Sequence, residues 1–427
     1  MKLHTTAVIF IILLFWNPSH GQRKPPKMLH GKDLEKQETY RSLDEAMRNR
    51  RRVYKLNLDG QDLSELPEKF SKLRRLQELY LRNNNFTEIP EVIFELPNLQ
   101  ILMLGENRIS AIPDEITTFK HLKELDLFSN QLTSIPASIG QMTTLTYLDF
   151  NWNRIDSLPD EICHLTKLEK LYLDKNQLNY LPENLGNLSK LVSLKIYQNN
   201  LVKLPASIGK LQLITELNAS NNNLESIPES IGDLKALVSL DLSGNALSEI
   251  PEKLSQLINL KELQLFSNKL TAIRGNSINL PTLEVLNLRI NKIGHFEPNT
   301  DQLKSLVRLD LEYNNLKKMP ASIYELTNLA YLNLSRNDIE RLESGIGNLV
   351  QLKELNLSNN KIYSVTKSIG KLEKLRILNL SDNEIILIPR QAAGMKKLEQ
   401  FFISGNKLSA SRKQKVKNYF PDRKSVV

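Results

Sequence analysis

Cysteine is almost absent from this chain of 427 residues, which contains only Cys163. A single cysteine cannot form an intramolecular disulfide, so a disulfide-stapled fold is excluded. Beyond a neighbouring histidine, no pattern of basic residues surrounds Cys163 to activate its thiol, and we expect this residue to fill a core position. Long apolar runs are also missing after residue 16. A membrane-spanning helix needs about 20 such residues, and the sequence predicts none.

Residues 1–21 have the organisation of a secretory signal peptide. Lys2 precedes an apolar run from Ala7 to Trp16, and Ser19 and Gly21 provide small residues before a cleavage point preceding Gln22. We therefore predict that residues 1–21 are removed and that the mature protein is secreted, periplasmic or held in the cell envelope. An uncleaved anchor or a misassigned start codon is the alternative.

The positive charge lies at the two ends of the chain. The net charge is +9, of which residues 22–52 carry +5 and residues 407–427 carry +6, whereas residues 53–406 carry −3. A nucleic-acid-binding protein needs a basic stripe along its working face, so we predict no nucleic-acid partner. We interpret the basic clusters at 50–52 and 412–417 as solvated surfaces. Weak contact with an anionic surface is the alternative.

The chain is built from one 23-residue repeat. Asparagine recurs with this spacing fifteen times, and Gln61 occupies the same position one repeat earlier, which gives sixteen units. The asparagines are Asn84, Asn107, Asn130, Asn153, Asn176, Asn199, Asn222, Asn245, Asn268, Asn291, Asn314, Asn337, Asn360, Asn383 and Asn406. Units this short cannot bury a core alone, so they must stack into a solenoid.

Each half of the repeat predicts one wall of that solenoid. Leu240 and Leu242 alternate as in a strand with one buried face, so successive units should form a parallel sheet with strands about 4.8 Å apart. Asn245 follows at the strand exit, where its amide can bond backbone groups of adjacent turns, and we predict a buried asparagine ladder. Ile250-Pro251 then begins a short helical or 3₁₀ return on the outer side.

The motif LxxLxLxxNxLxxIPxxIxxLxx resembles the leucine-rich repeat (LRR) family. Residues Leu122 to Met142 are an example, with Met142 in place of the last leucine, and the match extends over about 53–420. The 23-residue form with Ile-Pro or Leu-Pro is similar to repeats of Ras-suppressor-type, plant Ras-group and exported bacterial members. The resemblance implies an α/β solenoid, a horseshoe with a concave parallel β-sheet and short 3₁₀ or helical convex segments. It also implies a scaffold for protein interaction. The cysteine-rich caps typical of extracellular animal members are absent, which favours an exported bacterial protein.

The sequence divides into four parts: a signal peptide at 1–21, an N-terminal helical cap at 22–52, sixteen rungs at 53–408, and a C-terminal helical cap and tail at 409–427. Ser42-Leu-Asp-Glu45 is a capping box, and Leu43, Ala46 and Met47 share a face that can cover the first rung. Val416, Tyr419 and Phe420 have the spacing to do the same at the other end. The convex pattern breaks in residues 271–300, where we expect faster amide exchange than in residues 120–250.

Groups for catalysis or metal binding do not converge in the sequence. It has no serine–histidine–acid set, phosphate loop or Cys-x-x-Cys motif, and the histidines lie far apart. Asp126 and Asp149 fall at one strand position in adjacent rungs, with Glu124 and Asp174 nearby, and could together hold a cation or act as a paired acid and base. Lysines at 170, 175 and 195 lie nearby, however, and we interpret the cluster as mutually neutralised on a solvated face. We predict no enzymatic activity, no cofactor and no metal.

Aromatic residues gather at concave positions of rungs two to seven. Large aromatics on a sheet surface add nothing to the core and are typical of interface hot spots. We therefore predict that a protein or peptide ligand binds there, with the two aspartates selecting a basic feature; the alternative is that the aromatics only stack on each other. The predicted ligand-binding residues are Tyr80, Met103, Asp126, Phe128, Tyr147, Asp149, Trp152, Tyr172 and Tyr197. A second hypothesis is a structural envelope component whose basic ends hold it to glycans or anionic lipid.

Overall fold

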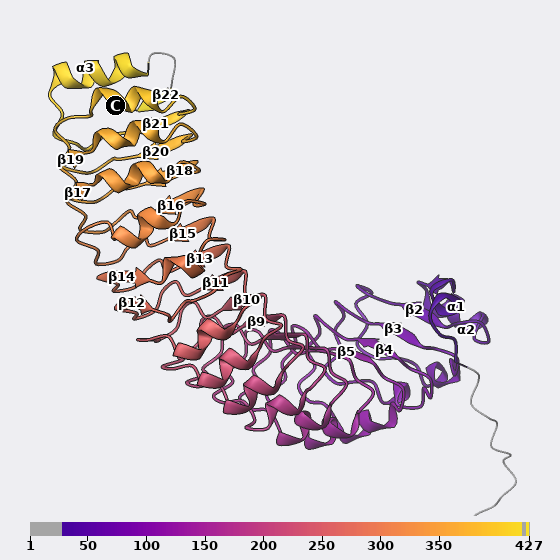
Figure 1. Ribbon diagram of the computed structural model, residues 1–427. Helices are drawn as coiled ribbons and strands as arrows, with labels where there is room; N and C mark the ends of the chain where they lie inside the picture. The colour runs from indigo at the N-terminus through magenta and orange to yellow at the C-terminus, as the bar shows by residue number, and fades with distance from the viewer. Residues whose placement is uncertain (1–27, 421–423, 427) are drawn as a thin grey trace, which may run out of the picture.

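The computed structural model describes residues 28–420 and 424–426, so the predicted signal peptide and the cleavage point before Gln22 lie outside the described residues. The described residues form a single curved solenoid, with residues 28–52 at one end and residues 410–420 at the other (Figure 1). Eighteen strands of the described residues form one parallel sheet on the concave side. These strands are β1 Thr39–Tyr40, β2 Lys55–Asn57, β3 Glu78–Tyr80, β4 Ile101–Met103, β5 Glu124–Asp126, β6 Tyr147–Asp149, β7 Lys170–Tyr172, β8 Ser193–Lys195, β9 Glu216–Asn218, β10 Ser239–Asp241, β11 Glu262–Gln264, β13 Val285–Asn287, β15 Arg308–Asp310, β16 Tyr331–Asn333, β18 Glu354–Asn356, β20 Ile377–Asn379, β21 Gln400–Phe402 and β22 Lys424–Val426.

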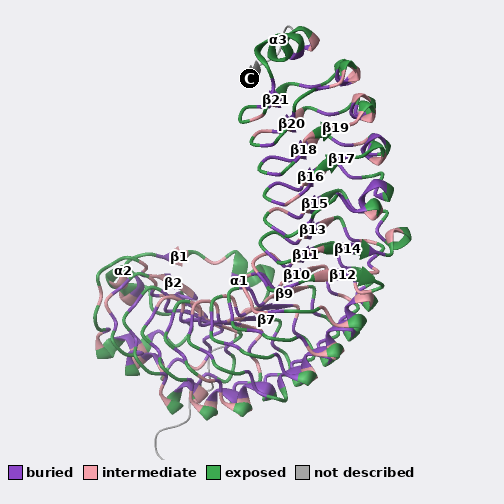
Figure 2. Cartoon of the chain, turned by 90° about the vertical axis from the view of Figure 1, so that its left-hand side faces the viewer, coloured by how far each residue is buried: buried purple, intermediate pink, exposed green. Residues whose placement is uncertain are grey.

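The repeat sets the register of the sheet. Each strand pairs with the next at an offset of one repeat, as in Glu124↔Tyr147 and Asp126↔Asp149. The middle residue of each three-residue strand from β2 to β21 in this sheet, such as Leu125 or Leu148, is buried. Burial concentrates inside the coil, while exposed residues mark the convex tips (Figure 2). The predicted solenoid and its concave parallel sheet are confirmed.

The asparagine ladder binds successive turns of the solenoid together. The Nδ2 of Asn222 donates to the carbonyls of Ile196 at 2.9 Å and Ala219 at 3.1 Å, and its Oδ1 accepts from the amide of Leu201 at 3.0 Å. Donors and acceptor are thus all used inside a buried site, as burial of an amide requires. Asn245 repeats the pattern one rung later. Gln61 departs from it: its Nε2 donates to the carbonyl of Arg41 in the N-terminal segment.

The convex side is a row of 3₁₀ turns, most of which begin after a proline. The proline is itself the extended residue that precedes the turn. Its fixed φ suits that conformation, and no backbone N–H donor is needed there. The turns are Glu68–Lys72, Glu91–Ile93, Asp114–Thr118, Ala137–Gln141, Asp160–His164, Leu185–Asn187, Ala206–Lys210, Glu229–Asp233, Glu252–Gln256, Thr300–Gln302, Ala321–Glu325, Ser344–Asn348, Lys367–Lys371 and Arg390–Gly394.

Two small parallel sheets lie on the convex edge where neighbouring rungs both lack that proline. Strands β12 (Ala272–Gly275) and β14 (His295–Pro298) pair with Arg274 opposite Glu297. Strands β17 (Arg341–Leu342) and β19 (Ser364–Val365) end just before Glu343 and Thr366, the next such pair. Proline cannot donate a ladder hydrogen bond, so its loss in adjacent rungs permits strand pairing. The segment 271–300, where the convex pattern breaks, therefore contributes an ordered pair of strands.

Both ends of the sheet are covered by short elements. Helices α1 (Lys32–Glu35) and α2 (Leu43–Arg48) flank β1, which adds a strand beside β2. The amide of Glu45 donates to the Ser42 hydroxyl at 3.4 Å, and Ala46 is fully buried. At the other end α3 (Ala410–Tyr419) packs Val416 and Phe420 on the last rung, with the Phe420 ring 5.4 Å from that of Phe401. No helix of the described residues is both long and apolar enough to cross a membrane.

Candidate ligand-binding face

Strand register brings most of the predicted binding residues together on the concave side. Tyr80, Met103, Asp126, Asp149 and Tyr172 occupy one row, each opposite the next on neighbouring strands β3 to β7. Tyr147 stands in the adjacent row, and Phe128, Trp152 and Tyr197 follow the ends of their strands. We call these nine residues the aromatic stripe.

The aromatic side chains of the stripe contact each other in pairs. The rings of Tyr147 and Tyr172 meet edge to face at 5.5 Å, and those of Phe128 and Trp152 at 6.3 Å. The Nζ of Lys175 lies 3.3 Å from the centre of the Trp152 ring, and Lys195 lies 5.0 Å from that of Tyr172. Stacking of this kind fixes ring orientation, yet Trp152 stays 51% exposed. The stripe is therefore internally packed: Trp152 is its one exposed side chain, its other aromatic rings are half-buried, and Met103, Asp126 and Asp149 are buried.

Asp126 lies in a different environment from the solvated face expected for it. The residue is only 3% exposed, and its Oδ2 accepts from Nε of Arg82 at 2.8 Å. Its Oδ1 accepts from the amide of Phe128 at 2.8 Å, so both oxygens are occupied. The neutralising cation is Arg82, two rungs away, and none of the lysines singled out in the sequence.

Asp149 is buried beside Asp126 and is held by uncharged donors. Its Oδ2 accepts from the Tyr147 hydroxyl at 2.9 Å and its Oδ1 from the amide of Asn151 at 2.9 Å. Loss of solvation, with a smaller contribution from the charge of Asp126, outweighs these bonds and raises the pKa of Asp149 to about 6. Asp174, one rung on, has its pKa raised to about 6, also chiefly by burial.

Cys163 occupies the core, as expected: it is buried and free. Burial raises the pKa of its thiol to about 11, which keeps it protonated and unreactive at neutral pH. The basic cluster at 50–52 is exposed beside α2, and the basic residues of α3 are exposed at the other end. Among the described residues, no group of three or more histidine, cysteine or acidic side chains is placed to hold a metal ion.

A second concave feature, in rungs twelve to sixteen, carries no aromatic pattern in the sequence and was not predicted. Strands β15, β16, β18, β20 and β21 enclose a shallow hollow of about 230 Å³, which we call the amide groove. Its polar and apolar lining residues include Arg308, Asp310, Tyr331, Asn333, Glu354, Asn356, Ile377, Asn379 and Phe402. The repeated Asn-x-Ser at 333–335, 356–358 and 379–381 is the sequence signal that could have identified it.

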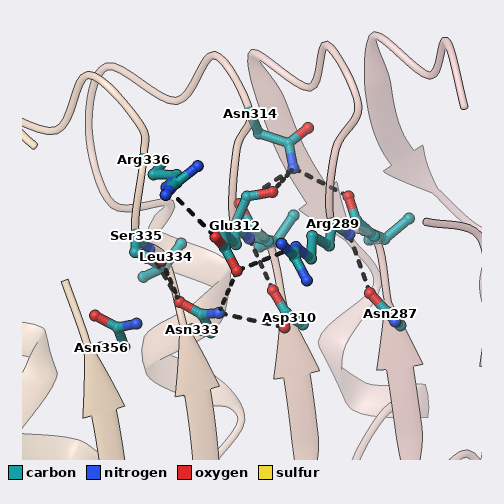
Figure 3. A network of polar contacts seen from close by, with 12 residues as sticks. Asn287, Arg289, Asp310, Glu312, Asn314, Asn333, Leu334, Ser335, Arg336 and Asn356 are labelled. Carbon is teal, nitrogen blue, oxygen red and sulfur yellow. Dashed lines mark hydrogen bonds and ion pairs between the residues drawn. The ribbon is translucent and has the colours of Figure 1, made fainter. Parts of the chain in front are cut away.

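A polar network closes one end of the amide groove (Figure 3). Glu312 forms ion pairs with two arginines: its Oε2 lies 3.1 Å from Nε of Arg289, and its Oε1 lies 3.6 Å from Nε of Arg336. The Nδ2 of Asn333 donates to the same carboxylate at 3.2 Å and to Asp310 at 3.3 Å. Burial raises the pKa of Asp310 above its usual range. These bonds fix the orientation of the side chains that border the groove.

The described residues form a stacked solenoid with an extended concave face, and this architecture defines a class of binding scaffolds. The chain belongs to the leucine-rich repeat proteins, a non-enzymatic binding fold. The model of the leucine-rich repeat region matches residues 46–152, 136–222 and 274–385, and a further leucine-rich repeat model matches residues 213–234 and 236–257. No curated protein matches significantly.

Solved structures show the same fold. An LRR protein of Leptospira interrogans is 34% identical with a TM-score of 0.83, over 92% of this chain and all of that one. The plant peptide hormone receptor RGFR1, in complex with RGF2, is 26% identical with a TM-score of 0.66 over 81% of this chain. The Arabidopsis receptor kinase HAESA, in complex with the peptide hormone IDA and a co-receptor, is 26% identical with a TM-score of 0.60 over 83% of this chain. This chain covers 61% of the RGFR1 chain and 65% of the HAESA chain.

Proposed function

We propose that this protein is an exported binding scaffold that holds a protein or peptide ligand against the aromatic stripe. The observation that carries the proposal is Trp152, a half-exposed indole on a rigid sheet, braced by Phe128 and by the ammonium of Lys175. Exposed aromatic anchors of this kind dominate the affinity of protein interfaces. The plant relatives in complex with peptide hormones support a ligand of the same class.

The buried aspartates change how such a ligand would be recognised. Asp126 is already paired with Arg82, and Asp149 accepts from Tyr147. A basic group of the ligand would have to displace these partners and desolvate further, at a cost in free energy. Aromatic contacts therefore lead the recognition in this proposal, and the two carboxylates keep Arg82 and Tyr147 in place.

The test compares variants of the mature chain, residues 22–427, immobilised and used to capture a partner that is then identified by mass spectrometry. Trp152→Ala and Tyr172→Ala should each weaken binding of the purified partner by about 1 kcal/mol or more, roughly fivefold in Kd. Tyr313→Ala is the matched control, because Tyr313 is similarly exposed at the repeat position of Trp152, in rung twelve. Unchanged affinity in both stripe variants, beside a loss in Asn356→Ala, would contradict the proposal.

The same capture experiment, repeated in low and high salt, distinguishes this proposal from the second candidate function, that of a structural envelope component. A structural component held by its basic ends to glycans or anionic lipid would lose its partner when salt screens the exposed Arg50–Arg52 cluster and α3. Binding through the aromatic stripe should persist.

Export and repeat subtype also belong to this proposal. The apolar run at 7–16 and the small residues before Gln22 support cleavage of residues 1–21. The Ile-Pro and Leu-Pro repeats support a subtype shared with exported bacterial LRR proteins. N-terminal sequencing of the full chain expressed in an exporting bacterium tests cleavage, and a protein that begins at Gln22 in the periplasm or medium is expected. Retention of Met1 in the cytoplasm would contradict it.

A further inference from the structure

The amide groove contains hydrogen-bonding groups whose orientation is fixed but which have no partner in the described chain. In Asn356, Oδ1 accepts from both the amide of Ser358 at 3.1 Å and its hydroxyl at 2.8 Å. In Asn379, Oδ1 accepts from the amide of Ser381 at 3.0 Å. Exchanging the oxygen and nitrogen of either side-chain amide would set an NH₂ group against an N–H donor, so the oxygen must face the backbone. The two Nδ2 groups then face the groove.

Neither of these Nδ2 groups donates to any described residue, in contrast to Asn333, whose Nδ2 is taken up by Asp310 and Glu312. Strand register places Asn333, Asn356 and Asn379 opposite one another on β16, β18 and β20. Figure 3 shows Asn333 and Asn356 side by side at the ends of their strands. The floor of the groove is thus a row of uncharged amides, of which the last two present open donors.

The walls supply acceptors and ring faces. Glu354 stands beside Asn356 and forms no ion pair among the described residues. Tyr331 lies one strand away, with the guanidinium of Arg308 4.9 Å above its ring. Phe402 stands at the far end, opposite Asn379. Two donors, an acceptor and two rings are therefore presented over the four strands β16, β18, β20 and β21.

We propose that the amide groove binds a neutral glycan chain built of hexose or N-acetylhexosamine units. Sugar hydroxyls are donors and acceptors at once, so one sugar can accept from Asn356 or Asn379 and donate to Glu354. The apolar ring faces of sugars can pack on Tyr331 and Phe402. The hollow, at about 230 Å³, is smaller than the 300–1,000 Å³ or so of pockets that enclose a whole small molecule. The ligand should therefore lie across the groove as a chain.

A peptide is the less favoured occupant. Peptide recognition on a sheet gains its specificity from pockets that receive alternate side chains, and from apolar anchors at the centre of the contact. In this groove the amides of β16, β18 and β20 form a continuous polar row, with the apolar surface of Tyr331, Ile377 and Phe402 beside it, and this mixture suits the hydroxyls and ring faces of a sugar chain. The aromatic stripe lies at least four rungs away, so the glycan site is independent of the proposed protein site.

The experiment measures binding of cellohexaose, maltohexaose and chitohexaose to the mature protein by titration calorimetry. At least one should bind with a Kd tighter than about 1 mM. Asn356→Asp and Asn379→Asp keep the Oδ1 acceptor and the side-chain shape but replace the open donor, and each should raise that Kd about tenfold. Tyr172→Ala should leave it unchanged.

Asn218→Asp is the matched control. Asn218 has the same Asn-x-Ser geometry, accepting from the amide and hydroxyl of Ser220, but lies on β9 outside the groove. The Kd of this variant should stay within about twofold of the parent. The proposal is wrong if none of the three hexasaccharides binds, or if all three aspartate variants weaken binding equally. Selection of extended peptides that lose affinity in Asn356→Asp, with no hexasaccharide bound, would make the groove a peptide site instead. Unchanged melting curves for the variants would establish that they fold.

Discussion

Arg82 reaches Asp126 across an intervening rung, with its Nε 2.8 Å from Oδ2. The rung between them carries Gly105, and a Cβ there would lie 3.2 Å from Oδ1 and 3.4 Å from Oδ2 of Asp126. The absence of a side chain at Gly105 thus leaves the space in which the ion pair forms. The ion pair therefore depends on three successive rungs: two supply Arg82 and Asp126, and the rung between them supplies Gly105.

The first prediction concerns this ion pair. Arg82→Met leaves the buried carboxylate of Asp126 without its cation, and we expect a loss of about 1–3 kcal/mol of stability. The pair is partly open on the Arg82 side, which places the expected value below that of a fully buried bridge. Adding Asp126→Asn to Arg82→Met should restore most of the loss. Urea denaturation followed by circular dichroism measures both, and a double variant as unstable as the single one would contradict the assignment.

The second prediction separates buried polar groups that have partners from one that has none. Asn222→Ala removes three ladder bonds and should destabilise by about 1–3 kcal/mol, and Leu240→Ala by about 2–5. Ser243 is also fully buried, but its hydroxyl has no partner among the described residues. Ser243→Ala should therefore keep or raise the melting temperature. Equal losses of stability in all three variants would contradict this assignment of roles to the repeat positions.

These cases show what the sequence could and could not predict. The 23-residue period is sufficient to predict the rungs, the buried leucines and the ladder, because each depends on contacts that recur at every repeat. The contact between Arg82 and Asp126 occurs once and depends on Gly105, so no periodic argument finds it. Likewise Asp126 and Asn356 occupy the same position of the repeat. Only the packing around each residue decides that the carboxylate of Asp126 is paired with Arg82, whereas the Nδ2 of Asn356 has no partner among the described residues.

The third prediction uses the raised pKa of Asp149, about 6 in the folded protein against 3.8 for a free carboxyl. The folded state holds this proton more tightly than the unfolded chain does, so the associated stabilisation is present at low pH. It is lost as the pH rises from about 4 to about 6. Asp149→Asn should therefore raise stability by on the order of 2 kcal/mol at pH 7.5 and have little effect at pH 4.

Melting curves across this pH range measure the effect of Asp149→Asn. Asp241→Asn is the control, because Asp241 also accepts from the amide two residues on, at 2.9 Å, but is less buried. This variant measures the loss of the same hydrogen-bond acceptor at a less buried position. A gain in Asp149→Asn of the same size at pH 4 and pH 7.5 would contradict a raised pKa.

The fourth prediction concerns backbone strain at Ile290. The residue before every ladder asparagine has a positive φ, and most rungs place a polar residue or glycine there. Ile290 has φ 51° and a β-branched side chain, for which this conformation is costly. Ile290→Asn should therefore stabilise the protein by about 0.5–1 kcal/mol. Asn359→Ile, the reverse change at φ 54°, should cost a similar amount. If neither asparagine nor glycine at position 290 raises the melting temperature, packing around Ile290 offsets the strain.

The last prediction concerns the convex sheet of β12 and β14. The broken proline pattern at 271–300 predicted faster amide exchange, whereas the structure pairs Ala272–Gly275 with His295–Pro298. Amides within a strand pair are protected, so we expect the amides of β12 and β14 to exchange as slowly as those of the 3₁₀ turns of neighbouring rungs, or more slowly. Glu297→Pro should abolish the pairing, because proline has no N–H and occupies the register position opposite Arg274. Hydrogen exchange with mass spectrometry should then show faster exchange in both strands, while Glu343→Pro, at the edge of the separate β17–β19 pair, leaves them protected. Rapid exchange of β12 and β14 in the parent protein would show instead that the missing prolines loosen the convex edge.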